Sequence, residues 1–302
     1  MTEPHSAPIG PVRWSQLSEH QALEELDRIV GALPGKPFLE VPERSGAHAW
    51  LFGDTHGDWP TAQRMLEAAL RSGEGRDRAI FLGDYVDRTP TELPQGSVLN
   101  ALSLLSAAAT LPDRVVLLRG NHETQRQIPG ILREAAVEAR CLWGERTPMA
   151  ERLEDAFGRL PLAAQLSSGV YLAHAGFPRT RSAASLPEEF ARTDDGLLFE
   201  VVWNDVLGSP VAGSRGIPCP PFTEEEVGAF LRAIGAEIFV RAHDPYLAGQ
   251  WSLGGKVLTL HTTRVFLWAG LWRACVPLSG RVGPGEVRLE PVEPAPLPPP
   301  SS

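Results

Sequence analysis

Five short segments of the chain carry side chains that could bind metal ions, and each follows an apolar run. They read GDTHGD at 53–58, GDYVDR at 83–88, GNHE at 120–123, AHAG at 173–176 and RAHD at 241–244. Any one of them could be an ordinary turn, because Asp and Asn often bond to their own backbone there. Together they offer carboxylate, imidazole and amide groups, which suit hard and borderline divalent cations.

The apolar runs before the first three segments predict buried strands. These runs, at 49–52, 79–82 and 115–118, alternate with helix-like patterns at 61–70 and 98–109. Short apolar runs bounded by turns are typical of strands that are covered on both faces. The order is βαβαβ, which predicts a parallel sheet with helices on its face.

The second half of the chain contains further expected elements. Strands are predicted at 170–173 and 238–240, and a capping-box pattern from Thr223 predicts a helix. The short apolar runs and glycine turns after Lys256 indicate antiparallel strands. Ligands bind beyond the carboxyl ends of strands in α/β sheets, so we expect the five segments to meet at one edge of one sheet.

Carboxylates gathered at such an edge would repel one another. Their pKa values would rise unless a positive charge lay between them. Bound cations supply that charge, so the grouping of Asp54, Asp84, Asn121, His174 and His243 predicts a metal site.

The composition is that of a globular protein. Of the 302 residues, 43% are apolar and 22% are charged, and the net charge of −9 argues against a protein dedicated to nucleic acid or an anionic membrane. No apolar run approaches the roughly 20 residues that span a bilayer, and the N-terminus has no basic-then-apolar signal. Cys141, Cys219 and Cys275 form no CxxC pair, which favours a reducing cytoplasm over a disulfide framework.

The ends of the chain differ from its middle. Residues 1–13 and 291–302 are rich in Pro and Ser, and we predict that both are disordered. No linker interrupts 14–290, which we predict to be a single α/β catalytic domain.

The sequence resembles the PPP-type serine/threonine protein phosphatases of the calcineurin-like metallophosphoesterase superfamily. GDTHG, GDYVDR and GNHE match the three signature blocks of that family in order. The likeness covers roughly residues 48–262 and continues through LPLAA, DGLL, WND, SRG and RAH segments. It implies a metallophosphatase fold, in which a central β-sandwich of two mixed sheets is flanked by helices in four αββα layers. The high Ala, Arg, Gly and Pro content would fit a bacterial member.

The resemblance also implies a role for each matching residue. Six side chains would hold two divalent ions: Asp54, His56 and Asp84 the first, and Asp84, Asn121, His174 and His243 the second, with Asp84 bridging. His122 would be the general acid and Asp87 would orient it, while Arg88 and Arg215 would bind the phosphate. Manganese is the expected metal, and iron or zinc would also suit these ligands.

These roles suit phosphate ester hydrolysis. Two ions about 3.5–4 Å apart can activate a shared water for attack on phosphorus, and a His beside a carboxylate can protonate the leaving oxygen. Arg presents paired donors to phosphate oxygens. We therefore predict hydrolysis of phosphoserine or phosphothreonine in a phosphoprotein or phosphopeptide. Diadenosine polyphosphates or other small phosphate esters are the alternative substrates, and a non-catalytic binding protein of the same fold is the alternative class.

The sequence departs from the family pattern at three places. Thr89 and Ala175 replace glycines, and 261–266 replaces a Ser-Ala-Pro-Asn-Tyr segment that overhangs the catalytic site. Residues beside the expected ligands are assigned structural roles. Asp58 should cap a helix and Glu123 should pair with backbone or an arginine. Asp244 and His261 could support ligands, but an ordinary structural role is favoured for both.

Overall fold

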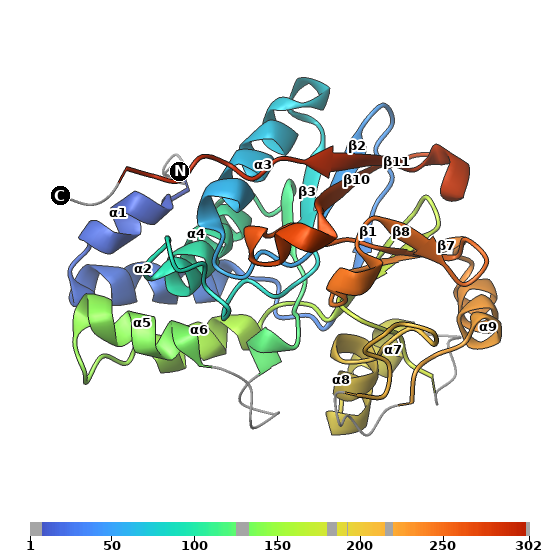
Figure 1. The fold of residues 1–302 in the computed structure, drawn as a ribbon. Helices are drawn as coiled ribbons and strands as arrows, with labels where there is room; N and C mark the ends of the chain where they lie inside the picture. Colours follow the sequence, from blue (N-terminus) through green and yellow to red (C-terminus); the bar gives the residue numbers. More distant parts are fainter. Residues whose placement is uncertain (1–7, 125–132, 180–185, 192, 215–219, 300–302) are drawn as a thin grey trace.

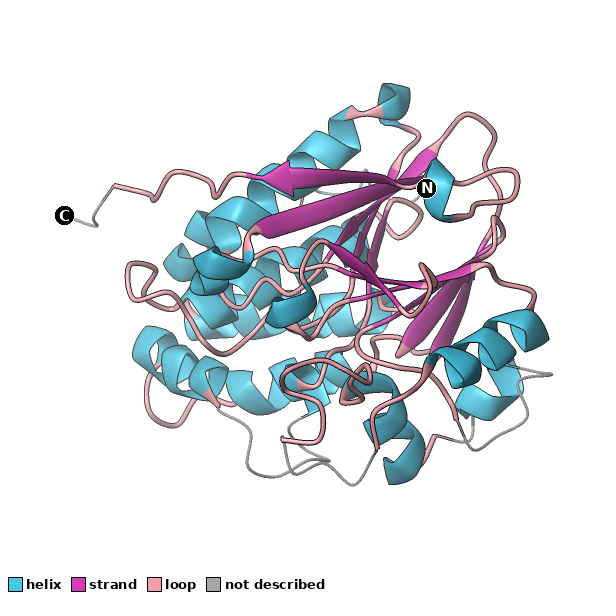
Figure 2. Ribbon diagram, turned by 45° about the vertical axis from the view of Figure 1, so that its right-hand side comes forward, coloured by secondary structure: helices cyan, strands magenta, loops and turns pink. Residues whose placement is uncertain are grey.

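Two β-sheets pack face to face, and helices cover their outer faces (Figures 1 and 2). The structure is a computed structural model that describes residues 8–124, 133–179, 186–191, 193–214 and 220–299. This arrangement confirms the predicted four-layer αββα fold. The single parallel sheet predicted from the βαβαβ pattern is wrong in one respect, because the strands that precede the five segments are divided between the two sheets.

The first sheet has five strands and carries the first three segments. Its order is β11 (Arg288–Val292), β10 (Leu271–Pro277), β2 (His48–Phe52), β3 (Arg78–Phe81) and β4 (Val115–Leu117). The strands β2, β3 and β4 are parallel, with Leu51 opposite Ile80 and Ile80 opposite Val116. Strand β10 runs antiparallel to both β2 and β11, as expected for the end of the chain.

The second sheet has six strands and carries the last two segments. Its order is β1 (Phe38–Val41), β5 (Ala163–Leu166), β6 (Val170–Ala173), β7 (Ile238–Arg241), β9 (Val257–Thr259) and β8 (Gln250–Ser252). Strands β6, β7 and β9 are parallel, so their carboxyl ends lie at the same edge. Strand β8 is antiparallel to β9, whereas β5 is antiparallel to β6 and parallel to β1.

The helices form two groups, one on each sheet. In Figure 1 the first group lies at the left and the second at the lower right. The first comprises α1 (Pro11–Gln16), α2 (Glu19–Ala32), α3 (Trp59–Arg71), α4 (Gly96–Thr110), α5 (Glu134–Trp143) and α6 (Met149–Gly158). The second comprises α7 (Leu186–Ala191), α8 (Asp195–Val202) and α9 (Glu224–Ile234). Short 3-10 turns include η2 (His122–Thr124), η4 (Pro245–Leu247) and η5 (Arg264–Ala269).

Strand β2 shows why the runs before the segments are apolar on both faces. Ala49 and Leu51 point between the sheets, whereas Trp50 and Phe52 pack under the first group of helices. A strand covered on both sides buries every residue and therefore loses the alternating polar pattern. The helix predicted from the capping box of Thr223 and Glu226 is present as α9, which that capping box begins.

The described residues near both ends of the chain are more ordered than their composition suggests. The backbone N–H of Ile9 donates to Ser106 Oγ at 2.9 Å, α1 begins at Pro11, and Trp14 is fully buried. Strand β11 extends to Val292, and the Ala295 N–H donates to Thr61 Oγ1 at 3.0 Å. The disorder expected over 1–13 and 291–302 therefore does not apply to these residues, because burial of apolar side chains and paired backbone groups outweighs a Pro-rich composition.

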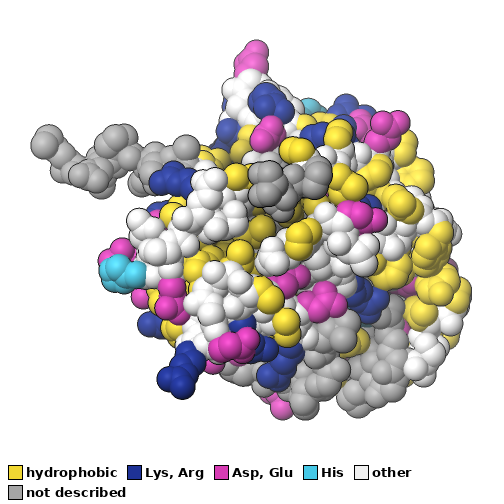
Figure 3. Space-filling model, turned by 60° about the vertical axis from the view of Figure 1, so that its left-hand side comes forward, with side chains coloured by type: hydrophobic (Ala, Val, Ile, Leu, Met, Phe, Trp, Pro, Cys, Tyr) yellow, Lys and Arg dark blue, Asp and Glu magenta, His cyan; other side chains and the backbone are white. Residues whose placement is uncertain are grey.

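The surface and the cysteines add little that is specific. Acidic and basic side chains are interspersed on the face drawn in Figure 3, so that face has no continuous basic area. Cys141 is exposed and Cys275 is buried, and both are free thiols, while Cys219 lies outside the described residues. Within the described part of the chain, no helix combines the length and apolar character needed to cross a bilayer.

Candidate metal centre

The loops that follow β2, β3, β4 and β7 line one pocket, where the two sheets meet. Its walls include seven of the predicted site residues: Asp54, His56, Asp84, Arg88, Asn121, His122 and His243. His174, after β6, lies fully buried beside them, and Asp87 is buried against His122. The structure thus brings together nine of the ten predicted residues. Arg215 lies outside the described residues.

The backbone of these loops is held in an unusual conformation. Asp84, Asp87 and Arg88 have φ values of 57°, 62° and 55°, and His56 and His243 have values of 39° and 74°. Residues other than glycine rarely adopt this left-handed region, which costs about 1–3 kcal/mol each where it is strained. Such conformations persist where the surrounding structure fixes them. Here they occur at four residues that line the pocket and at Asp87, which contacts His122.

Close backbone contact explains one glycine of the motifs. A Cβ on Gly120 would lie 2.2 Å from Asp84 Oδ1 and 2.5 Å from the Asp84 backbone nitrogen. Only glycine therefore lets the third segment approach the second closely enough for the His122 N–H to donate to Asp84 Oδ1 at 3.0 Å.

Asp54, His56 and Asp84 form the first group of donors. His56 Nδ1 lies 2.9 Å from the Val86 carbonyl, so it carries the proton and leaves Nε2 as a lone-pair donor. That Nε2 lies 3.6 Å from Asp54 Oδ2 and 3.7 Å from Asp84 Oδ2. All three side chains are about 2% exposed.

Asp84, Asn121, His174 and His243 form the second group. His174 Nδ1 donates to the Leu82 carbonyl at 2.8 Å, which again leaves Nε2 for a ligand. Nε2 lies 2.8 Å from Asn121 Oδ1, 3.2 Å from His243 Nδ1 and 3.4 Å from Asp84 Oδ2. Because Asp84 Oδ2 faces both His56 and His174, it stands between the two groups.

The two groups fit divalent cations. Ligands at about 2.1 Å from an ion stand roughly 3.0–3.4 Å apart around it, which is close to the separations found here. Burial by itself raises the pKa of Asp54 and of Asp84, but the neighbouring histidines hold both pKa values below their usual range. Burial lowers the pKa of His174, whereas Asp84 and Asp54 raise it, to about 9 overall. The ionised carboxylates are therefore stabilised by the positive charge of neighbouring histidines, and a bound ion would supply that charge in place of their protons.

A proton-carrying pair lies next to the donors. His122 Nδ1 is 2.8 Å from Asp87 Oδ2, and Asp87 Oδ1 accepts from the backbone N–H of Glu134 at 2.7 Å. His122 Nε2 points toward the donor groups and lies 3.9 Å from Asp84 Oδ2. The carboxylate thus fixes the ring so that Nε2 can hold or release a proton at the pocket.

Aromatic rings form the mouth of the pocket. Arg88 is exposed, and its guanidinium carbon lies 5.5 Å from the centre of the Phe266 ring. The Trp268 ring is tilted against that of Tyr246, with 4.8 Å between ring centres, and its centre lies 6.2 Å from that of Phe266. Phe266 and Trp268 belong to η5, which begins three residues after His261 and overlaps the 261–266 segment that departs from the family pattern.

The side chains beside the donors have the structural roles predicted for them. Asp58 caps α3 and binds Arg264, with 2.9 Å between Oδ1 and Nε. Glu123 accepts from the backbone N–H groups of Asp84, Tyr85 and Gly120 at 2.8–2.9 Å. Asp244 caps η4.

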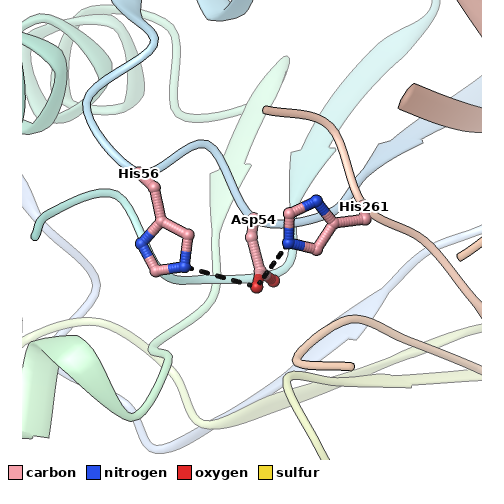
Figure 4. A group of neighbouring side chains, drawn as sticks. All are labelled: Asp54, His56 and His261. Atoms are coloured by element: carbon pink, nitrogen blue, oxygen red, sulfur yellow. Dashed lines mark ion pairs between the residues drawn. The ribbon is translucent and has the colours of Figure 1, made fainter. Parts of the chain in front are cut away.

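His261, for which the sequence favours an ordinary structural role, lies directly beside the first group of donors. Its Nε2 is 3.3 Å from Asp54 Oδ2, and its donor atom lies within 4.8 Å of those of Asp54 and His56 (Figure 4). A signal for this was present in the sequence, because His261 follows an apolar strand as the other donors do. The bridge between Asp54 and His261 brings the two strand ends together.

Comparisons with known proteins agree with this geometry. The profile of the calcineurin-like phosphoesterase family matches residues 47–247. A probable serine/threonine-protein phosphatase of Encephalitozoon cuniculi is 32% identical over 232 residues, which cover 73% of this chain and 48% of that protein. Serine/threonine-protein phosphatase 5 of Arabidopsis thaliana is 26% identical, over 80% of this chain and 44% of that protein. The chain spans about half the length of these curated relatives.

Solved structures share the fold. A protein serine/threonine phosphatase from Saccharomyces cerevisiae superposes with a TM-score of 0.74 and 22% identity, covering 93% of this chain and 92% of that one. A cold-active protein-tyrosine phosphatase of a Shewanella species has a TM-score of 0.55 and 14% identity, covering 80% and 77%.

The fold and the donor groups define a metallophosphoesterase architecture. The chain belongs to the calcineurin-like phosphoesterase family, since the family profile matches well over half of it. Its curated relatives quoted above are eukaryotic, so they give no support to the bacterial origin expected from composition.

Proposed function

We propose that the protein is a two-metal phosphatase that acts on phosphoserine or phosphothreonine in proteins. One observation carries the proposal. Six donor side chains form two groups with Asp84 in common, and the His122–Asp87 pair lies beside them at the same pocket. The names of the curated relatives, which are serine/threonine-protein phosphatases, support this substrate class.

The six donor side chains would hold two divalent ions. Asp54, His56 and Asp84 would hold one ion, and Asp84, Asn121, His174 and His243 the other. When bound, the ions supply Lewis-acid polarisation of the phosphoryl oxygens and lower the pKa of a coordinated water. We propose manganese, with iron or zinc as alternatives, because imidazole and carboxylate ligands suit these metals.

The remaining residues handle the proton and the phosphate. His122 holds a proton at Nε2 and gives it to the departing serine or threonine oxygen, because an alkoxide is a poor leaving group. Asp87 keeps the ring in that orientation through Nδ1. Arg88 lines the pocket, where its planar donors can bind phosphate oxygens. We assign Arg215 the same task on the resemblance alone.

A second candidate function is favoured by the pocket mouth. Tyr246, Phe266 and Trp268 line the pocket and present ring faces or edges beside the donors. Bases stack on such rings with about 1–3 kcal/mol each, so a dinucleoside polyphosphate could bind there. The proposed cytoplasmic location, which rests on the cysteine pattern, suits either substrate.

A substrate comparison separates the two functions. We expect the manganese-loaded protein to hydrolyse phosphoserine and phosphothreonine peptides with a higher kcat/KM than diadenosine polyphosphates. Release of inorganic phosphate from peptides and loss of intact dinucleotide measure the two reactions. Negligible peptide turnover beside rapid dinucleotide cleavage would establish the second candidate instead, and inactivity on both, including a generic aryl phosphate, would favour a binding protein.

A further inference from the structure

His261 enters the centre from a strand that carries none of the six predicted ligands. It follows β9 of the six-stranded sheet and forms a backbone bridge with Asp54, which follows β2 of the five-stranded sheet. The Thr262 N–H donates to the Asp54 carbonyl at 3.1 Å and fixes this approach. The His261 side chain is fully buried.

The ring of His261 is aimed at the first donor group. Its Nε2 lies 3.3 Å from Asp54 Oδ2, the same oxygen that faces His56 Nε2 at 3.6 Å (Figure 4). The donor atoms of Asp54, His56 and His261 all lie within 4.8 Å of one another. Phe266 packs edge-on against His261, with 5.2 Å between ring centres.

The hydrogen bonding of His261 differs from that of an ordinary buried histidine. Nδ1 has no hydrogen-bond partner among the described residues, and Nε2 has only the contact with Asp54. Buried polar groups are nearly always satisfied, and leaving one unsatisfied is costly. A cation between Asp54, His56 and His261 would use the Nε2 lone pair and remove part of that cost.

We propose that His261 is a seventh metal ligand, which binds the first ion through Nε2. The proposal rests on the proposed two-metal site. Each ion would then have two imidazoles and two oxygen ligands: Asp54, Asp84, His56 and His261 for the first, and Asp84, Asn121, His174 and His243 for the second. A second imidazole ligand, from His261, favours manganese, iron, cobalt or zinc over magnesium at the first site.

Cobalt binding tests the proposal without measuring activity. The metal-free 302-residue chain is titrated with Co²⁺. Binding is followed by visible absorption and by elemental analysis after dialysis. We expect two equivalents in the wild type. In H261A we expect one of the two sites to weaken by at least about 10–100-fold, since the loss of even an outer partner of a ligand has an effect of that size.

A matched variant and a second substitution separate ligation from a structural role. His48, at the start of β2, is partly exposed, and its Nδ1 lies 3.7 Å from Asp77 Oδ1. It does not line the pocket, so H48A should still bind two equivalents of Co²⁺. H261F retains a ring at the buried position but has no lone pair for a metal, so it should lose the same site as H261A. Wild-type Co²⁺ affinity at both sites in H261A and H261F, even with a lowered Tm, would overturn the proposal and leave a structural ion pair with Asp54.

The wild-type protein provides a measurement that does not depend on any variant folding. In NMR spectra of the Co²⁺-loaded protein with labelled histidine, four rings should show large paramagnetic shifts from direct coordination if His261 is a ligand. Three such rings would overturn the proposal while leaving the two-metal function intact. Fewer than two bound equivalents in the wild type would instead contradict the proposed function itself.

Discussion

His122 is the residue whose role depends most on a single contact. Its Nδ1 is held by Asp87 at 2.8 Å, and this contact decides that Nε2 faces the pocket. The ring packs edge-on against His56 with 5.0 Å between ring centres, and the donor atoms of His56, Asp84 and His122 lie within 4.8 Å of one another. Because Asp87 already holds Nδ1, we expect proton transfer to be separable from metal binding at this residue.

Replacement of His122 by Asn tests that separation. We expect H122N to retain both metal equivalents and to lower kcat on phosphopeptides by about 10²–10⁴-fold, because the leaving alkoxide is no longer protonated. The kcat on an aryl phosphate, whose leaving group needs little protonation, should fall much less. The ratio of the two kcat values measures the effect, and an equal loss on both substrates would show that His122 does not donate the proton.

At the scale of elements, α5 supports the second motif loop from behind. The Thr89 N–H donates to Glu134 Oε2 at 2.8 Å, and the Thr89 hydroxyl donates to Glu138 Oε1 at 2.6 Å. Glu138 Oε2 also accepts from the Val98 N–H at the start of α4. Thr89, which replaces the family's glycine, thus gives the loop a side-chain contact with α5 that glycine could not make.

This support predicts a pH-dependent stability. The pKa of Glu138 is raised to about 7, mainly because the side chain is buried. Hydrogen bonds from Thr89 and Val98 lower this pKa, whereas the negative charges of Glu134 and Asp87 raise it further. Glu138 therefore binds its proton more tightly in the folded state than in the unfolded state. Its contribution to stability is fully present below its ordinary pKa of 4.5 and is lost as the pH rises through about 7. The neutral amide of E138Q cannot ionise and can still accept from Val98 and donate to Thr89.

Urea unfolding measures the effect. When the pH is raised from about 5 to about 8, the free energy of unfolding of the wild type should fall by about 1–3 kcal/mol more than that of E138Q. Glu145, which follows α5 with a side chain 91% exposed, offers a matched control, and E145Q should behave as the wild type does. Identical pH profiles for wild type and E138Q would contradict the assignment.

Local patterns predicted most elements but not their division between sheets. Residues 49–52, 170–173 and 238–240 lie in strands, because a run of apolar side chains needs no knowledge of its partner to be recognised. Which sheet a strand joins depends on pairings between residues far apart, such as Leu51 with Ala274. That information does not reside in any one run.

The candidate site shows the same boundary between local and distant information. The motif blocks identified Asp54, Asp84 and Asn121, since each block is a short sequence with a recognisable order. His261 belongs to no block, and its nearness to Asp54 arises only from the pairing of β9 with β7 and the meeting of the two sheets. Ile9 likewise lies in a segment for which composition predicts disorder, because its burial depends on the distant helix α4, whose Ser106 accepts from its backbone N–H.

At the scale of the whole molecule, the centre joins the two sheets. Asp54, Asp84 and Asn121 come from the five-stranded sheet, whereas His174 and His243 come from the six-stranded sheet. Ions bound among them would therefore tie the layers together. The unfolded chain has no such arrangement, so binding to the folded state alone should raise stability by about 2.7 kcal/mol at a metal concentration 100 times Kd.

Metal removal should consequently lower the Tm of the entire fold. We expect manganese added to chelator-treated protein to raise Tm by several degrees, on the order of 5 °C, since each kcal/mol shifts Tm by about 2–4 °C in chains of this size class. D84N should abolish most of the rise, because one carboxylate serves both donor groups. D58N is the matched control: Asp58 is buried nearby but caps α3 and binds Arg264, so it should lower the starting Tm and retain the rise. A full manganese effect in D84N would show that the ions bind elsewhere and that the two sheets are not joined through Asp84.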